Sequence, residues 1–109
     1  MLDAADVVRL QEECEAVRAD DAVLDYLVAL VTATRTSPLL TLGVSPRGSL
    51  ALLRAARARA LMEGRDFLVP DDLKALIVPA LAHRVLMTSG APPADTVIRA
   101  ISEAVAVPR

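Results

Sequence analysis

A chain of 109 residues is long enough for one domain with its own hydrophobic core and too short for two. Apolar residues make up 54% of the chain but aromatic residues only 2%, so the core has to be built from Leu, Val, Ile and Ala, a composition that favours helices. The net charge of −2 argues against a general nucleic-acid binder, the single cysteine excludes an internal disulfide, and no run reaches the ~18 apolar residues of a membrane span.

Two helices are predicted in the first third of the chain. Asp3 can cap a helix over about residues 4–17, where apolar residues recur at steps of three and four. Asp20-Asp21 offers a second cap, and the helix over about 21–34 is apolar around much of its girth, which predicts a central position. Asp3 and Asp6 also interrupt any apolar run near the start, so no secretory leader is expected and the cytoplasm is the default location.

Residues 35–45 interrupt the helical periodicity. Pro38 and Gly43 mark a loop, yet three of its residues, at positions 39, 40 and 42, are leucines. An apolar loop is expected to pack on something, either on this domain or on a partner domain.

A third helix is expected to follow at once. Ser45 is a strong N-cap, and Pro46 suits the first helical position because its missing N–H has no helical partner there. The helix should run to about Glu63 and stop at Gly64.

The last third of the chain predicts two more helices. A short extended link over 65–69 leads to a helix from Pro70 to about Ala82 or Arg84, with a possible disturbance at Pro79. A linker over 89–93 precedes a final amphipathic helix over about 94–105. The pattern as a whole predicts an all-α protein, a compact bundle of four or five helices whose neighbours run nearly antiparallel.

Ordinary catalytic constellations are missing from the sequence, so no catalytic residue is assigned and no metal ligand is expected. No Cys or His cluster has metal-binding spacing, and no glycine-rich phosphate loop ends in Lys-Ser or Lys-Thr. Asp20-Asp21 and Asp71-Asp72 are interpreted as acids at helix starts. His83, the one histidine, is expected to be partly buried and hydrogen-bonded at a helix end.

The segment Gly43-Val-Ser-Pro-Arg-Gly-Ser49 is the candidate binding feature. A helix start attracts anions through its free N–H groups and its dipole, and Arg47 in the first turn could add a bidentate contact to a phosphate. Gly43 and Gly48 keep the nearby side chains small, so that a ligand or another backbone could come close. From the residues alone, a plain capped helix with a solvated Arg47 is the preferred interpretation.

This segment, with Leu50-Ala-Leu-Leu-Arg-Ala-Ala56 after it, resembles the sensor-2 segment of MoxR-type AAA+ ATPases. Other stretches resemble the same family in order and spacing, so that the resemblance covers about residues 3–108. They are Asp25-Tyr-Leu-Val28 with Thr34-Arg35, Glu63-Gly-Arg-Asp-Phe-Leu-Val-Pro-Asp-Asp72, Leu81-Ala-His-Arg84 and Val105-Ala-Val-Pro108.

The resemblance implies that residues 1–109 form a single helical C-terminal lid, a fragment starting at Met1 without the P-loop αβα domain of its parent ATPase. Arg47 would be the sensor-2 arginine that reaches the terminal phosphates of ATP, with Ser45, Pro46 and Gly43 around it. The parent would bind ATP and Mg, hydrolyse ATP in a ring, usually a hexamer, and couple hydrolysis to chaperone-like maturation of a client protein. The fragment itself is expected neither to catalyse hydrolysis nor to bind nucleotide tightly.

Four further residues keep open roles. Thr34 and Arg35 would face the nucleotide or a neighbouring subunit if they follow the family, whereas Arg35 could simply complement a helix C-terminus. Arg54 and Arg57, one turn apart, could contact a P-loop domain or a neighbouring subunit, but a solvated face is the simpler interpretation.

Two other functions compete with the lid. A stand-alone helical module could bind a protein partner through the leucine-rich loop, without nucleotide chemistry. A helix-turn-helix DNA binder could use Arg54, Arg57 and Arg59, but the acidic balance and the divergent direction of Arg59 argue against it.

Overall fold

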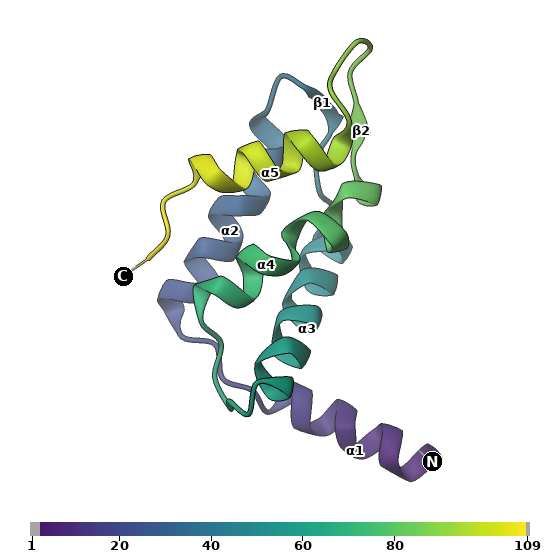
Figure 1. The fold of residues 1–109 in the computed structure, drawn as a ribbon, viewed down its shortest axis with the longest axis vertical. Helices are drawn as coiled ribbons and strands as arrows, with labels where there is room; N and C mark the ends of the chain where they lie inside the picture. The colour runs from purple at the N-terminus through teal and green to yellow at the C-terminus, as the bar shows by residue number, and fades with distance from the viewer. Residues whose placement is uncertain (1–2, 109) are drawn as a thin grey trace.

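The computed structural model describes residues 3–108 and consists of helices with one small sheet (Figure 1). The all-helical fold class predicted from the sequence is confirmed. The elements in chain order are α1 (Ala4–Glu15), α2 (Asp21–Thr36), β1 (Leu40–Leu42), α3 (Pro46–Met62), α4 (Pro70–Leu81), the 3-10 turn η1 (Ala82–Arg84), β2 (Leu86–Met87) and α5 (Ala94–Ala104).

The core lies between α2, α3, α4 and α5, and Figure 1 shows α2, α3 and α4 running in alternating directions. Its side chains are aliphatic apart from Tyr26, and burial raises the pKa of the Tyr26 hydroxyl. The fully buried aliphatic residues include Leu30, Leu52, Leu73, Ile77, Leu81 and Ile98. The central position predicted for the second helix is therefore confirmed, because α2 contributes six buried residues.

Helix α1 projects away from this core (Figure 1). A capping box starts it, with the Asp6 N–H bonded to Asp3 and the Asp3 N–H bonded to Asp6. No residue of α1 is buried, and the radius of gyration, 14.9 Å, exceeds the ~13 Å typical of a compact chain of about 100 residues. The helix ends at Glu15, earlier than predicted, because Arg18 bonds through its backbone to Asp66 and Leu68 at 2.8 and 2.7 Å.

The segment predicted as a loop over 35–45 contains a strand. Helix α2 continues to Thr36, and β1 then pairs antiparallel with β2, which places Leu40 opposite Met87. Leu40 is buried against this domain, whereas the side chains at positions 39 and 42 are exposed. Only one of the three leucines thus packs on this domain, and the other two remain free for a partner.

Helix α4 ends at Leu81, slightly before the predicted end at about Ala82 or Arg84. Pro79 is tolerated within it, but after Leu81 the chain tightens into η1. The prediction that His83 is partly buried and hydrogen-bonded is wrong: His83 is exposed, between Leu81, which is fully buried, and Val85, the next residue to pack against the core.

Candidate functional site

The start of α3 has the capped geometry that the sequence predicts. Ser45 is the N-cap, its hydroxyl accepts a hydrogen bond from the Gly48 N–H at 3.2 Å, and Pro46 occupies the first helical position. The Ser45 carbonyl accepts from both the N–H and the hydroxyl of Ser49. Since Pro46 has no N–H and that of Gly48 is taken, the first turn offers an anion little beyond Arg47 itself.

Arg47 is exposed in this first turn. Helical geometry places it on one stripe of α3 with Leu50, Arg54 and Arg57, at steps of three and four residues. Leu50 and Arg54 are also exposed, while the Nε of Arg57 is buried without a hydrogen-bond partner among residues 3–108.

The two glycines of the segment are needed for packing within the chain. A Cβ on Gly43 would lie 2.7 Å from the Cα of Arg35, and a Cβ on Gly48 would lie 2.8 Å from a Val44 methyl group. Of the two approaches left open by the sequence, ligand or backbone, the backbone of α2 therefore occupies the space beside Gly43.

Thr34 and Arg35 lie near the end of α2 and hold the segment that leads into α3. The Thr34 hydroxyl accepts from the Val44 N–H at 3.1 Å, and Arg35 donates from Nε to the Val44 carbonyl at 2.9 Å. Arg35 is thus more than a charge at a helix C-terminus.

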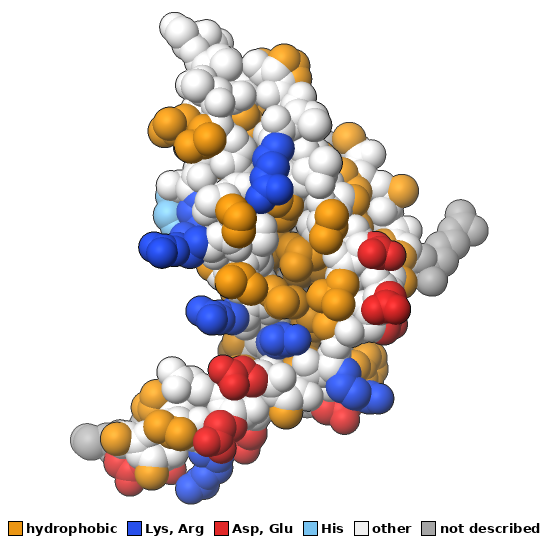
Figure 2. All heavy atoms as spheres, turned by 180° about the vertical axis from the view of Figure 1, so that it is seen from behind, with side chains coloured by type: hydrophobic (Ala, Val, Ile, Leu, Met, Phe, Trp, Pro, Cys, Tyr) orange, Lys and Arg blue, Asp and Glu red, His pale blue; other side chains and the backbone are white. Residues whose placement is uncertain are grey.

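An apolar groove runs beside the Arg47 stripe. It lies between α2 and α3 and has a volume of about 450 Å³. Its lining residues are Leu27, Val28, Val31, Thr32, Arg35, Pro46, Ser49, Leu50 and Leu53. A second hollow of about 750 Å³ between α1 and α3 shares Leu50 and Leu53 and adds Arg54 and Arg57. Figure 2 shows apolar side chains gathered in the middle of this rear face, with Lys and Arg below them.

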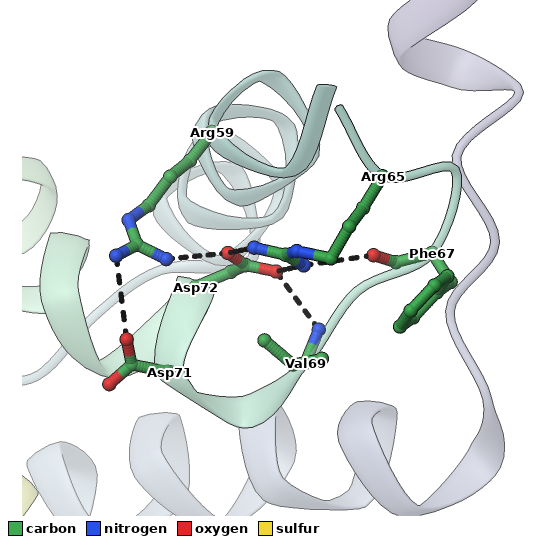
Figure 3. Close-up of polar contacts among 6 residues, drawn as sticks. All are labelled: Arg59, Arg65, Phe67, Val69, Asp71 and Asp72. Atoms are coloured by element: carbon green, nitrogen blue, oxygen red, sulfur yellow. Dashed lines mark hydrogen bonds and ion pairs between the residues drawn. The ribbon is translucent and has the colours of Figure 1, made fainter. Parts of the chain in front are cut away.

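A buried ion-pair cluster lies at the opposite end of α3 (Figure 3). Asp72 of α4 is completely buried and accepts from Arg65 at 2.7 and 2.8 Å and from Arg59 at 2.6 Å. It also accepts from the Val69 N–H at 2.9 Å, as expected of an acid at a helix start. Burial by itself would raise the pKa of Asp72, but these hydrogen bonds outweigh it and lower the pKa to about 2.

This cluster was not predicted from the sequence beyond the helix-start role of Asp72. Its position at the far end of α3 from Arg47 makes it a structural feature, which ties α3, the link over 65–69 and α4 together. Arg59, considered above as a DNA contact, forms ion pairs with Asp71 and Asp72 instead.

Neither a metal site nor a membrane span is found in the part of the chain that the structure describes. Within residues 3–108, no three His, Cys, Asp or Glu side chains gather closely enough to hold a metal ion. None of the helices over the same residues has the length and apolar character to cross a bilayer.

Comparison with known proteins points to one family. Residues 32–105 match the family described as AAA lid domain. The chain is 44% identical over 107 residues to the uncharacterized protein YeaC of Bacillus subtilis, covering 94% of this chain and 33% of YeaC. It is 37% identical over 97 residues to the chaperone MoxR1 of Mycobacterium tuberculosis, covering 81% of this chain and 26% of MoxR1.

The fold has a solved counterpart. A crystal structure from Cytophaga hutchinsonii, described as a candidate ATPase, superposes with a TM-score of 0.89 at 24% identity, over 96% of this chain and 36% of that one. The chain spans between about a fifth and a third of the length of the curated relatives it matches.

Proposed function

The chain belongs to the AAA lid domain family, as the C-terminal lid of a MoxR-type AAA+ protein, and on this basis we propose that it closes over the nucleotide of an ATPase and senses it through Arg47. The rest of the parent would supply a P-loop αβα domain. The observation that carries the proposal is the position of Arg47, exposed at the firmly held start of α3 and beside an apolar groove.

The residues present fit one side of a bound nucleotide. An exposed guanidinium at a helix start suits the terminal phosphates of ATP, because it is permanently charged and can make two parallel hydrogen bonds. Bound ATP and Mg would supply the phosphoryl group and the charge neutralisation for its transfer. We assign Mg to the P-loop domain of the parent, which would hold the phosphates that the ion bridges.

The groove fits the role of a docking surface within the parent. Val28 and Leu50 are 62% and 52% exposed although both line it, and the buried Nε of Arg57 has no hydrogen-bond partner within residues 3–108. Covering this face with the P-loop domain would remove the apolar side chains from water and place the nucleotide next to Arg47. Arg54 and Arg57 would then contact that domain or a neighbouring subunit of a ring, usually a hexamer.

The relative MoxR1 is named a chaperone, and we extend this to the parent of the present chain as chaperone-like maturation of a client protein. Movement of the lid between the nucleotide states would be the mechanical step, because the buried Asp72 cluster and the shared core make α2 to α5 one unit.

Steady-state ATP hydrolysis by the full-length protein tests the assignment. Arg47→Ala is expected to lower kcat by about 100-fold or more, in the range found when one charge-stabilising group is removed from an active site. Arg99→Ala, which removes an exposed arginine from α5, is the matched control and should retain normal turnover. Normal turnover in Arg47→Ala, equal to that of Arg99→Ala, would show that Arg47 does not act at the nucleotide site.

A further inference from the structure

The backbone of Val44 is held on both sides by two consecutive residues of α2. Its N–H donates to the Thr34 hydroxyl at 3.1 Å, and its carbonyl accepts from the Arg35 Nε at 2.9 Å. Val44 itself is almost completely buried, so water cannot replace these partners. Val44 immediately precedes Ser45, the cap of the helix that carries Arg47.

Thr34 is suited to this place by its hydroxyl. It is fully buried, donates to the Val31 carbonyl at 2.6 Å and at the same time accepts from the Val44 N–H. A hydroxyl can do both, whereas the valine of the same shape can do neither. Packing of Gly43 against the Arg35 backbone brings the two segments close enough for both bonds.

The contacts form one continuous path from α2 to the start of α3. Thr34 and Arg35 fix Val44, Ser45 then caps the Gly48 N–H at 3.2 Å, and Arg47 lies between these two residues in the first turn. A group that stabilises charge has to be held within about 0.5 Å of its working position, so freedom at Val44 would be transmitted directly to Arg47.

We propose that Thr34 and Arg35 are positioning residues for Arg47: they clamp the backbone of Val44 and so set where the start of α3 presents its guanidinium. This inference rests on the proposed function of Arg47 as the nucleotide-sensing residue. Thr34 and Arg35 act through the backbone and need no contact with the nucleotide.

The clamp is measured first in the 109-residue chain, by hydrogen exchange of the Val44 amide. Thr34→Val should speed this exchange by about tenfold or more, because the buried N–H loses its acceptor. Thr34→Ser keeps the hydroxyl and should retain the slow exchange of the wild type. Thr36→Val is the matched control: the Thr36 hydroxyl donates to the Ala33 carbonyl at 3.3 Å and not to Val44, so its replacement should leave the Val44 amide unchanged.

The link to Arg47 is measured in the full-length protein by a double-mutant cycle on ATP turnover. Thr34→Val is expected to lower kcat by about tenfold when Arg47 is present and by less than about twofold when Arg47 is already alanine. A residue that merely supported folding would lower both rates by the same factor. Arg35→Met, which keeps the aliphatic stem and removes the Nε donor, should follow the same pattern and serves if Thr34→Val fails to fold.

The outcomes separate the two proposals. Normal turnover in Arg47→Ala would overturn the proposed function and with it the purpose of the clamp. A large loss in Arg47→Ala, together with an equal effect of Thr34→Val in both backgrounds, would overturn the positioning role alone. Slow Val44 exchange in Thr34→Val and in Arg35→Met would show that the clamp does not hold this segment.

Discussion

Replacing Asp72 by asparagine tests the buried cluster that joins α3 to α4. Asparagine keeps the shape and an oxygen that can accept from the Val69 N–H, but it removes the charge that faces Arg59 and Arg65. Breaking a buried ion pair by removing one partner leaves the other charge uncompensated. The chain should therefore unfold at a lower urea concentration.

The pKa of Asp72 gives the magnitude. A fall from 3.8 to about 2 on folding corresponds to about 2 kcal/mol at ~1.4 kcal/mol per pKa unit, and the arginines left unmatched would add to that loss. We expect Asp72→Asn to lower the free energy of unfolding by about 2–4 kcal/mol at neutral pH. Asp71→Asn is the control, because Asp71 is exposed and 3.4 Å from Arg59; it should cost less than about 1 kcal/mol.

The same pKa fixes how this effect depends on pH. Because folding lowers the pKa of Asp72, the stabilisation is complete above the unfolded value of 3.8 and is lost as the pH falls through about 2. Urea unfolding followed by circular dichroism should therefore show the gap between wild type and Asp72→Asn closing between about pH 5 and pH 2. A gap that stays constant over this range, or one no larger than that of Asp71→Asn, would refute the reasoning.

Three further predictions concern the glycines and the isolated chain. Gly43→Ala should lower the free energy of unfolding by about 1–3 kcal/mol, because its Cβ would lie 2.7 Å from the Arg35 Cα, whereas Leu42→Ala at an exposed neighbour should be near neutral; equal urea midpoints would contradict this. Gly64→Ala should cost about 1–2 kcal/mol, because Gly64 has a φ of +77° at the end of α3; an unchanged thermal midpoint would argue against that strain. Calorimetric titration of the 109-residue chain with ATP should show a Kd weaker than about 1 mM, because Arg47 holds only one side of the polyphosphate; micromolar binding would show a complete nucleotide site.

Local signals account for most of what the sequence predicted. Ser45-Pro46 starts α3 as expected, and Gly64 ends it with two backbone bonds, from Gly64 to Leu61 and from Arg65 to Ala60. Such start and stop signals depend on neighbouring residues, so they can be recognised in one sequence. The spacing of apolar residues likewise predicted that α2 and α5 each bury one face, and both helices do.

Features that join distant segments escaped prediction. Strand β1 exists because it pairs with β2, more than 40 residues later, and neither segment has a strand pattern of its own. The early end of α1 likewise coincides with the pairing of Arg18 to the link over 65–69, almost 50 residues later.

The candidate site shows the same division. The sequence placed Arg47 in a capped first turn, and this geometry is found. It could not show that Thr34 and Arg35 hold Val44, because those bonds connect residues nine and ten positions apart across a turn. Their motif was recognisable only as part of a family resemblance, which gives no bonding partner.

The central claim is that Arg47 of this lid contacts the terminal phosphates of ATP. A structure of the full-length protein with a non-hydrolysable ATP analogue measures that contact directly. The account predicts an Arg47 guanidinium nitrogen within about 3 Å of a γ-phosphate oxygen, with the groove between α2 and α3 covered by the P-loop domain. An Arg47 side chain in solvent, with the nucleotide bound elsewhere, would contradict it.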